Sequence, residues 1–218
     1  MGALSNGRRR SRPVLLVPGT GGFAYPYWSA MSRRLVDDDF HVYVKNFPWF
    51  NLVDVKRSAA KVARKAEFVL EDSGAEEIDV VGHSLGGIIL RYYVERLGGH
   101  RVVKNLVTLG TPHHGTLASA AAWPFAAMRQ IVYGSPFLQE MNGSFKRNGT
   151  RYTSIYSATD EACLPFWSCR FPGADNRMLL ACGHLGLLLH PRVYGWVREV
   201  LRSEAAPKIP SAAEYAGT

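Results

Sequence analysis

The chain has 218 residues, of which 47% are hydrophobic and 20% are charged, values typical of a single globular domain. This composition excludes a disordered, collagen-like or coiled-coil protein, and no apolar run approaches the ~20 residues of a membrane-spanning helix. The net charge of +8 would suit a nucleic acid or an anionic membrane. No nucleic-acid-binding motif accompanies it, and half of it comes from four arginines near the N-terminus: Arg8, Arg9, Arg10 and Arg12.

Short apolar runs alternate with longer amphipathic runs along the chain, a pattern typical of the α/β class with a parallel sheet flanked by helices. In chain order the runs predict strand 14–17, helix 28–36, strand 41–44, helix 53–70, strand 78–81, helix 84–97, strand 106–109, strand 152–156, strand 178–181 and helix 191–201.

Three other segments complete the predicted organisation. The stretch 115–149, rich in alanine and aromatic residues, is expected to be partly helical and to form a wall over the edge of the sheet. We expect residues 1–12 to form a flexible basic tail, 13–202 to form one domain and 203–218 to form a loose tail.

One pentapeptide carries the strongest chemical signal. Gly82-His83-Ser84-Leu85-Gly86 matches G-x-S-x-G and lies between a predicted strand and a predicted helix. In that context the serine sits on a sharp, strained turn that exposes its hydroxyl, and side chains at the two glycines would clash. The pattern predicts that Ser84 is a catalytic nucleophile.

A serine hydroxyl needs a histidine to take its proton, and in this architecture the histidine comes last in the chain. His184 follows the predicted strand 178–181, at the carboxyl end where ligand sites of α/β sheets lie. His190 stands beside a proline at a helix start and is typical of a surface or capping residue. The earlier histidines lie far from the serine or leave no room for an intervening acid other than Glu95: His100, His113 and His114.

The acid that orients the histidine should also leave the carboxyl edge of the sheet. Asp160 follows the predicted strand 152–156 and is the best placed carboxylate. Its neighbour Glu161 and the turn residue Asp175 are alternatives, and a turn-capping role is the competing interpretation of Asp160.

Acyl transfer also needs backbone N–H donors that already point at the developing oxyanion. One should belong to Leu85, the residue after the serine. The other should come from the Gly-rich loop Pro18-Gly19-Thr20-Gly21-Gly22, with Thr20 as the candidate donor. A phosphate-binding loop is excluded because the Walker lysine and the third Rossmann glycine are missing.

Five segments together resemble the bacterial triacylglycerol lipases of the small α/β-hydrolase type: Val-Pro-Gly-Thr-Gly-Gly (17–22), Gly-His-Ser-Leu-Gly-Gly (82–87), Thr-Pro-His-His-Gly-Thr (111–116), Tyr-Ser-Ala-Thr-Asp-Glu (156–161) and Gly-His-Leu-Gly-Leu (183–187). The resemblance implies an α/β-hydrolase fold with a minimal lid or none, and it places the triad on Ser84, Asp160 and His184 and the oxyanion donors on Thr20 and Leu85. Pro18 departs from the pattern, since many relatives carry histidine there.

The resemblance favours a lipase that cleaves acylglycerol esters through an acyl-enzyme. A short-chain esterase or polyesterase, an acyltransferase and a non-enzymatic binding module remain as alternatives. We expect an ester or lipid substrate, met at a lipid–water interface, and an acyl pocket whose lining would otherwise be plain core: Phe23, Tyr25, Trp123 and Leu185.

Further expectations concern the setting of the protein. The resemblance implies secretion, with the leader absent from this sequence and a cytoplasmic location as the alternative, and we expect a monomer without metal or cofactor. His113 and His114 have no third ligand at useful spacing and are interpreted as loop residues. An odd cysteine count allows at most one disulfide within the chain, and we hypothesise a bridge between Cys163 and Cys169.

Overall fold

The computed structural model describes residues 12–20, 25–45, 52–122 and 124–203, and it contains a six-stranded sheet. The strand order is β2-β1-β3-β4-β5-β6, and every neighbouring pair is parallel. The predicted α/β class is therefore confirmed. The predicted tails fall almost wholly outside the described residues and stay predictions.

The strands of the sheet agree closely with the apolar runs of the sequence: β1 (Val14–Val17), β2 (Val42–Val44), β3 (Ile78–His83), β4 (Val103–Leu109), β5 (Arg151–Ser157) and β6 (Asp175–Leu179). Only β6 is clearly displaced, since it begins at Asp175 and its first residues are polar.

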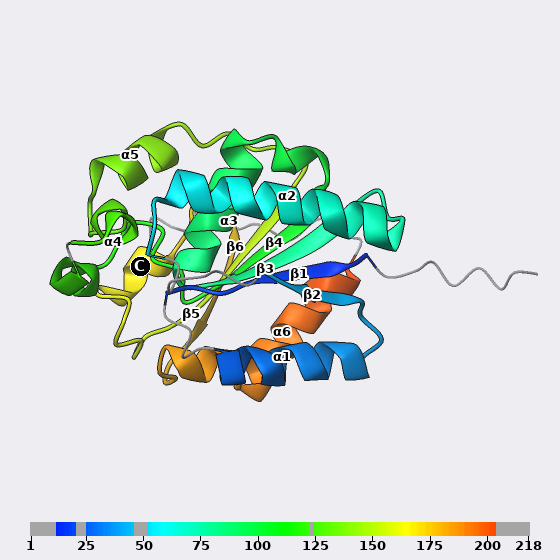
Figure 1. Cartoon of the computed structure of the whole chain (residues 1–218). Coiled ribbons are helices and arrows are strands. Elements are labelled where there is room, and N and C mark those ends of the chain that lie inside the picture. The colour runs from blue at the N-terminus through cyan, green and yellow to red at the C-terminus, as the bar shows by residue number, and fades with distance from the viewer. Residues whose placement is uncertain (1–11, 21–24, 46–51, 123, 204–218) are drawn as a thin grey trace, which may run out of the picture.

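Helices cover both faces of the sheet. Figure 1 shows α2 (Val55–Ser73) and α3 (Leu85–Arg96) on one face, and α1 (Tyr25–Asp37) and α6 (Pro191–Arg202) on the other. Two short helices, α4 (Ala126–Gln130) and α5 (Pro136–Gly143), occupy the long segment that was expected to be partly helical. Among the described helices, none is both long and apolar enough to cross a membrane.

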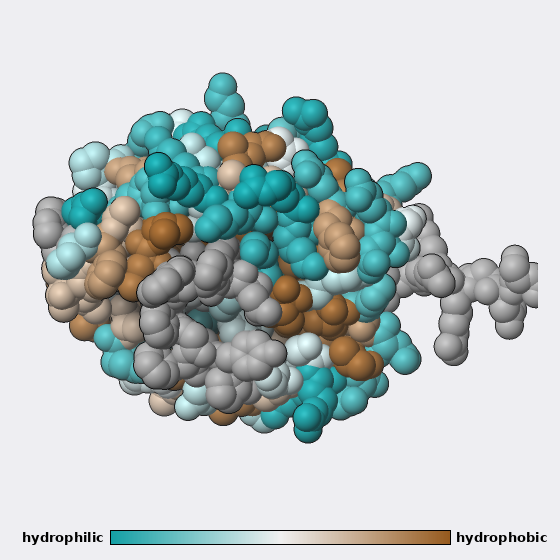
Figure 2. Space-filling view, in the orientation of Figure 1, coloured by the Kyte–Doolittle hydropathy of each residue, from teal (hydrophilic) through white to brown (hydrophobic). Residues whose placement is uncertain are grey.

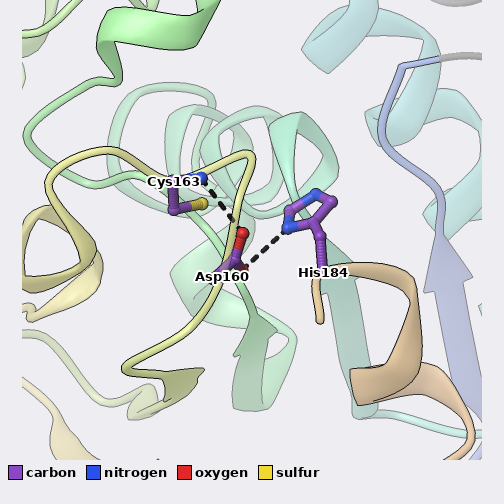
Figure 3. Close-up of side chains that lie close together, drawn as sticks. All are labelled: Asp160, Cys163 and His184. Atoms are coloured by element: carbon purple, nitrogen blue, oxygen red, sulfur yellow. Dashed lines mark hydrogen bonds and ion pairs between the residues drawn. The ribbon is translucent and has the colours of Figure 1, made fainter. Parts of the chain in front are cut away.

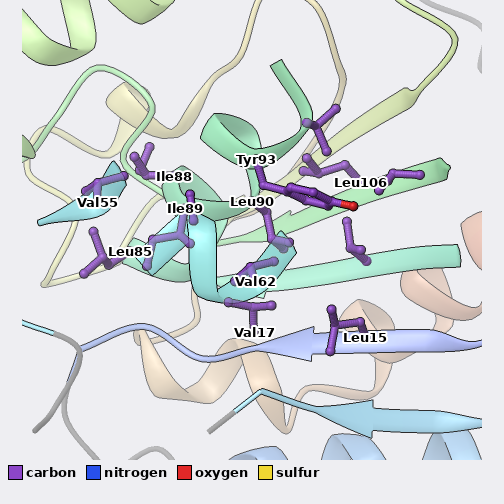
Figure 4. Packing of buried hydrophobic residues seen from close by; sticks show 14 of the residues in the cluster. Leu15, Val17, Val55, Val62, Leu85, Ile88, Ile89, Leu90, Tyr93 and Leu106 are labelled. Atoms are coloured by element: carbon purple, nitrogen blue, oxygen red, sulfur yellow. The ribbon is translucent and has the colours of Figure 1, made fainter. Parts of the chain in front are cut away.

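The alternation of side chains along β1 divides the core into two layers. Leu15 and Val17 pack into the cluster formed with α2 and α3, as Figure 4 shows. Val14 and Leu16 point the other way and join the cluster formed with α1 and α6. All four side chains are fully buried, which explains why this strand is apolar throughout rather than alternating.

The parallel topology decides where chemistry can take place. Because every strand runs the same way, the loops that follow β1, β3, β4 and β5 all leave from one edge of the sheet. Those loops carry the Gly-rich segment, Ser84, the segment 110–116 and Asp160.

Candidate active site

Ser84 occupies the sharp turn between β3 and α3. Its backbone has φ 56° and ψ −129°, and Asp39 is the only other described non-glycine residue with a positive φ. The turn is held by the Ser84 N–H, which donates to the Leu109 carbonyl at 2.9 Å, and by the Thr111 hydroxyl, which donates to the Ser84 carbonyl at 2.9 Å. This is the strained strand-to-helix geometry that the motif predicts.

The two motif glycines have the steric role expected of them. A Cβ on Gly86 would lie 2.2 Å from the Val17 carbonyl oxygen, and one on Gly82 would lie 2.7 Å from the Gly87 nitrogen. Both clashes involve backbone atoms, which have little freedom to move. The turn therefore requires glycine at both positions.

Asp160 and His184 form a buried pair on the same edge of the sheet. The His184 ring Nδ1 lies 2.8 Å from Asp160 Oδ2, and the two residues are only 8% and 2% exposed. The other carboxylate oxygen, Oδ1, accepts the backbone N–H groups of Ala162 and Cys163 at 2.9 and 3.0 Å. Both oxygens of Asp160 are thus held, with Oδ2 aimed at the ring.

The neighbouring carboxylate has a different role. Glu161 Oε2 accepts the backbone N–H of His184 at 3.0 Å, so it contacts the main chain of that residue rather than its ring. Asp175, the other candidate acid, is the first residue of β6 and pairs with Arg177. The geometry therefore favours Asp160 among the three carboxylates.

Burial and hydrogen bonding act in opposite directions on His184. Burial lowers its pKa, but the hydrogen bond to Asp160, together with the neighbouring Cys163, more than offsets this and raises the pKa above 6.5. With Nδ1–H donated to Asp160, the other ring nitrogen is left to accept a proton.

His83 contacts both the main chain and the ring of His184. Its Nε2 lies 3.1 Å from the His184 carbonyl oxygen, and the two ring centroids are 4.5 Å apart. Burial lowers the pKa of His83 well below 6.5, so its ring is neutral and Nε2–H donates to that carbonyl. His184 is thus packed against the residue that directly precedes Ser84.

The Gly-rich loop after β1 lies against the serine turn. A Cβ on Gly19 would lie 2.7 Å from Ser84 Cβ and 3.3 Å from the Leu85 nitrogen. The Leu85 N–H is the first of α3, where no carbonyl of the helix can accept it. Thr20 follows in the same loop and is half-buried. Both predicted oxyanion donors thus belong to segments that meet at Ser84.

The structure describes only part of the predicted acyl pocket. Phe23 and Trp123 lie outside the described residues, and of Tyr25 only its place at the start of α1 is described. Leu185 begins the 3-10 helix η6 (Leu185–Leu188) and packs, half-buried, against the core cluster beside α1 and α6. Their contact with substrate stays a prediction.

Cys163 was not anticipated beside the pair. Among the described residues, Asp160, Cys163 and His184 are the group with donor atoms close enough to hold a metal, all within 4.8 Å of one another (Figure 3). Tetrahedral zinc would separate its ligand atoms by more than ~3 Å, whereas Nδ1 and Oδ2 are 2.8 Å apart. The neighbouring Cys169 and burial raise the pKa of the Cys163 thiol, which keeps it protonated beside the pair. The spacing fits a shared proton better than a metal ion.

The three cysteines are free in the structure, so the hypothesised disulfide is not formed. Cys163 and Cys169 share one small buried cluster with Tyr156. Their proximity follows from the fold of the loop after β5, and burial protects both thiols from oxidants.

A buried polar network behind the serine helix was also missed. Arg91 is fully buried, and its guanidinium forms two hydrogen bonds with Glu95 and one with Asn142 Oδ1. Its Nη1 also lies 3.3 Å from Nδ1 of His113. The sequence pattern favours a loop residue at His113 rather than a metal ligand. Burial, reinforced by the Arg91 charge, lowers the pKa of His113 well below 6.5. A single arginine in a helical segment gives no sequence signal of such burial.

His190 is the N-cap residue of α6, and its ring Nδ1 accepts the backbone N–H of Arg192 at 3.1 Å. The capping role expected from the sequence is therefore confirmed.

Comparison with known proteins gives the chain a family. The palmitoyl protein thioesterase family model matches residues 13–159. Two curated proteins named triacylglycerol lipase, from Pseudarthrobacter phenanthrenivorans and Burkholderia plantarii, are each 32% identical over 110 residues, or 48% of this chain. The match covers 34% and 30% of those proteins, so the chain spans about a third of their length. The resemblance to bacterial triacylglycerol lipases is confirmed.

Solved structures support the fold. Lipase B of Aspergillus fumigatus superposes with a TM-score of 0.78 at 21% identity, over 94% of this chain and 56% of that one. The mature lipase BlEst2 of Bacillus licheniformis gives 0.74 at 16% identity, over 88% and 93%. At these identities the likeness concerns the fold, which is that of α/β-hydrolases. With a family model matching more than half of its length, the chain belongs to the palmitoyl protein thioesterase family.

Proposed function

We propose that this protein is a serine hydrolase that cleaves carboxylic esters of lipids through an acyl-enzyme. The observation that carries the proposal is the strained backbone of Ser84, with φ 56°, at the edge where the buried Asp160–His184 pair lies. A structural turn would not need a serine in a conformation that costs a non-glycine residue ~1–3 kcal/mol.

The proposed reaction uses these groups in sequence. Ser84 Oγ attacks the ester carbonyl while His184 Nε2 takes its proton, and the backbone N–H groups of Leu85 and Thr20 bind the oxyanion. The tetrahedral intermediate then collapses: the ester C–O bond breaks, and the leaving alcohol takes the proton from His184. Water, deprotonated by His184, attacks the acyl-enzyme and releases the carboxylic acid, which restores Ser84.

The test compares wild-type protein with Ser84→Ala on p-nitrophenyl esters. We expect the substitution to lower kcat by at least ~10⁴-fold, because the remaining groups offer no nucleophile. An organophosphonate should label the wild-type protein on Ser84 and leave the variant unlabelled. Ser73→Ala, at the last residue of α2, where the hydroxyl donates to the Val69 carbonyl, is the matched control. Hydrolysis that survives Ser84→Ala would refute the proposed mechanism.

A thioester is the second candidate substrate, favoured by the family model, whose description names a thioesterase. The same groups would cleave it, with a thiol as the leaving group. Rates on oxygen esters and acyl thioesters of matched chain length distinguish the two.

The length of the acyl chain separates a lipase from a short-chain esterase. A lipase should retain its rate beyond about C6, whereas a sharp fall would favour the short-chain esterase. Added alcohol would reveal an acyltransferase through a new ester product.

A further inference from the structure

The segment 111–116 joins the two halves of the proposed site. At one end, the Thr111 hydroxyl donates to the Ser84 carbonyl at 2.9 Å. At the other end, the Thr116 hydroxyl donates to the Ala162 carbonyl at 2.8 Å and accepts the Leu164 N–H at 2.9 Å. The segment therefore contacts both the serine turn and the loop that carries Asp160.

The contact made by Thr116 leads directly to the acid. The Ala162 carbonyl and the Cys163 N–H belong to one peptide group, and that N–H donates to Asp160 Oδ1 at 3.0 Å. The other carboxylate oxygen, Oδ2, bonds the ring of His184 at 2.8 Å. Thr116, the Ala162–Cys163 peptide, Asp160 and His184 thus form one continuous series of hydrogen bonds.

We propose that Thr116 is a positioning residue, which orients Asp160 through the Ala162–Cys163 peptide. This inference rests on the proposed function, because it concerns the same pair of residues. The hydroxyl fixes the plane of the peptide, so its N–H is held toward Oδ1, and the carboxylate has little freedom to rotate away from the ring. A hydrogen bond to the carbonyl also polarises the peptide and strengthens the bond that its N–H donates.

Because the residues of this series are buried, the loss of one hydrogen bond should displace Asp160. Thr116 is 4% exposed and Asp160 is 2% exposed, so water has little access to replace a lost bond. A buried group left without its hydrogen bond is unfavourable, and the loop would rearrange to restore a partner. A rearranged loop would change the direction of the carboxylate.

The segment itself is fixed from the other side by the Arg91 network. Asn142 Nδ2 donates to the His113 carbonyl at 2.9 Å, and Arg91 Nη1 donates to Asn142 Oδ1 at 3.0 Å. The His113 ring stacks on Phe171, with centroids 5.0 Å apart, and its Nε2 lies 3.1 Å from the Thr108 hydroxyl. The segment that carries Thr116 is therefore itself fixed, so Thr116 can hold the loop that carries Asp160 in place.

The test compares three variants with wild type. Thr116→Val keeps the shape and removes the hydroxyl, whereas Thr116→Ser keeps the hydroxyl. Thr150→Val is the matched control, since Thr150 is 6% exposed and its hydroxyl donates to the Val103 carbonyl at 2.9 Å. This bond lies at the amino ends of β4 and β5, whereas the proposed site lies at the carboxyl ends. We expect Thr116→Val to lower kcat by ~10–100-fold with KM changed less than ~3-fold, because a distant mutation that displaces a reacting group by ~1 Å can cost ~10²-fold. Thr116→Ser should recover most of that loss, and Thr150→Val should change kcat by less than ~3-fold.

A second readout does not depend on turnover. The downfield proton resonance of the His184 Nδ1–H group reports its bond to Asp160, and Thr116→Val should shift or broaden it, while Thr150→Val leaves it unchanged. Equal kcat values and resonances in the two valine variants would overturn the proposal, as would failure of Thr116→Ser to recover. Wild-type protein without esterase activity would refute the proposed function instead, and the resonance would still decide the role of Thr116.

Discussion

Ser84 shows how a single residue is held in an unfavourable conformation. Its N–H donates to Leu109, and its carbonyl accepts both the Thr111 hydroxyl and the Gly87 N–H. Each of these bonds would weaken if φ relaxed to a negative value. The positive φ is thus determined by the sheet, the helix and the segment after β4 together, which is how strain persists at a functional turn.

Replacing the acid should separate the roles of the two adjacent carboxylates. We expect Asp160→Asn to lower kcat by roughly 10⁴-fold, because the amide can hold the ring in the wrong tautomer and cannot stabilise the imidazolium. Glu161→Gln is the control, since an amide oxygen can still accept the His184 N–H. It should cost less than ~10-fold. Comparable losses in both variants would contradict the assignment of Asp160.

The pH profile gives a further prediction. His184 must be neutral to accept the serine proton, so kcat/KM should fall as the pH drops through the pKa of its ring. Because the bond to Asp160 raises that pKa, the acid limb should lie above pH 6.5 in the wild type. In Asp160→Asn the limb should move to lower pH. A limb that does not move would show that another group titrates.

Helix α3 begins at the serine turn and closely approaches β1. Alanine is favoured over glycine inside a helix by ~1 kcal/mol, so Gly195→Ala in α6, where a Cβ would meet nothing within 4 Å, should stabilise the protein by ~0.5–1 kcal/mol. Gly86→Ala should do the reverse, since its Cβ would lie 2.2 Å from the Val17 carbonyl oxygen. We expect a loss of ~1–3 kcal/mol or more. Chemical denaturation measures both, and equal effects would disprove the close approach.

Elements with a clear apolar pattern were predicted well, and β6 shows where the pattern fails. Asp175, Asn176 and Arg177 are polar, yet they form the start of the strand because their backbone pairs with β5 in the register Thr153 with Asp175. Arg177 bonds both Asp175 and Glu199 of α6, so polar contacts replace the missing apolar ones. Such an edge strand cannot be recognised by hydrophobicity alone.

The accessibility of the thiols tests the packing of the whole molecule. Cys163 and Cys169 are 1% and 0% exposed, whereas Cys182 is half-buried. We expect a disulfide reagent such as DTNB to react with about one thiol in the native protein and with all three after unfolding in denaturant. Cys182→Ser should remove the native reaction. A single reactive thiol in the denatured, non-reduced protein would show that a bridge has formed.

The sequence by itself predicted the order of strands and helices, the serine turn and His184 as the candidate histidine, because these predictions depend on local patterns. Apolar periodicity, glycine at a tight turn and the order of residues along a parallel sheet can all be read from neighbouring positions. The tertiary structure decided which of two adjacent carboxylates meets the histidine ring, and it placed Cys163, Arg91 and Thr116 around the site. The bonds from Thr116 to Ala162 and from Arg91 to Asn142 join residues far apart in the chain, and they form where burial leaves a polar group no partner except another part of the protein.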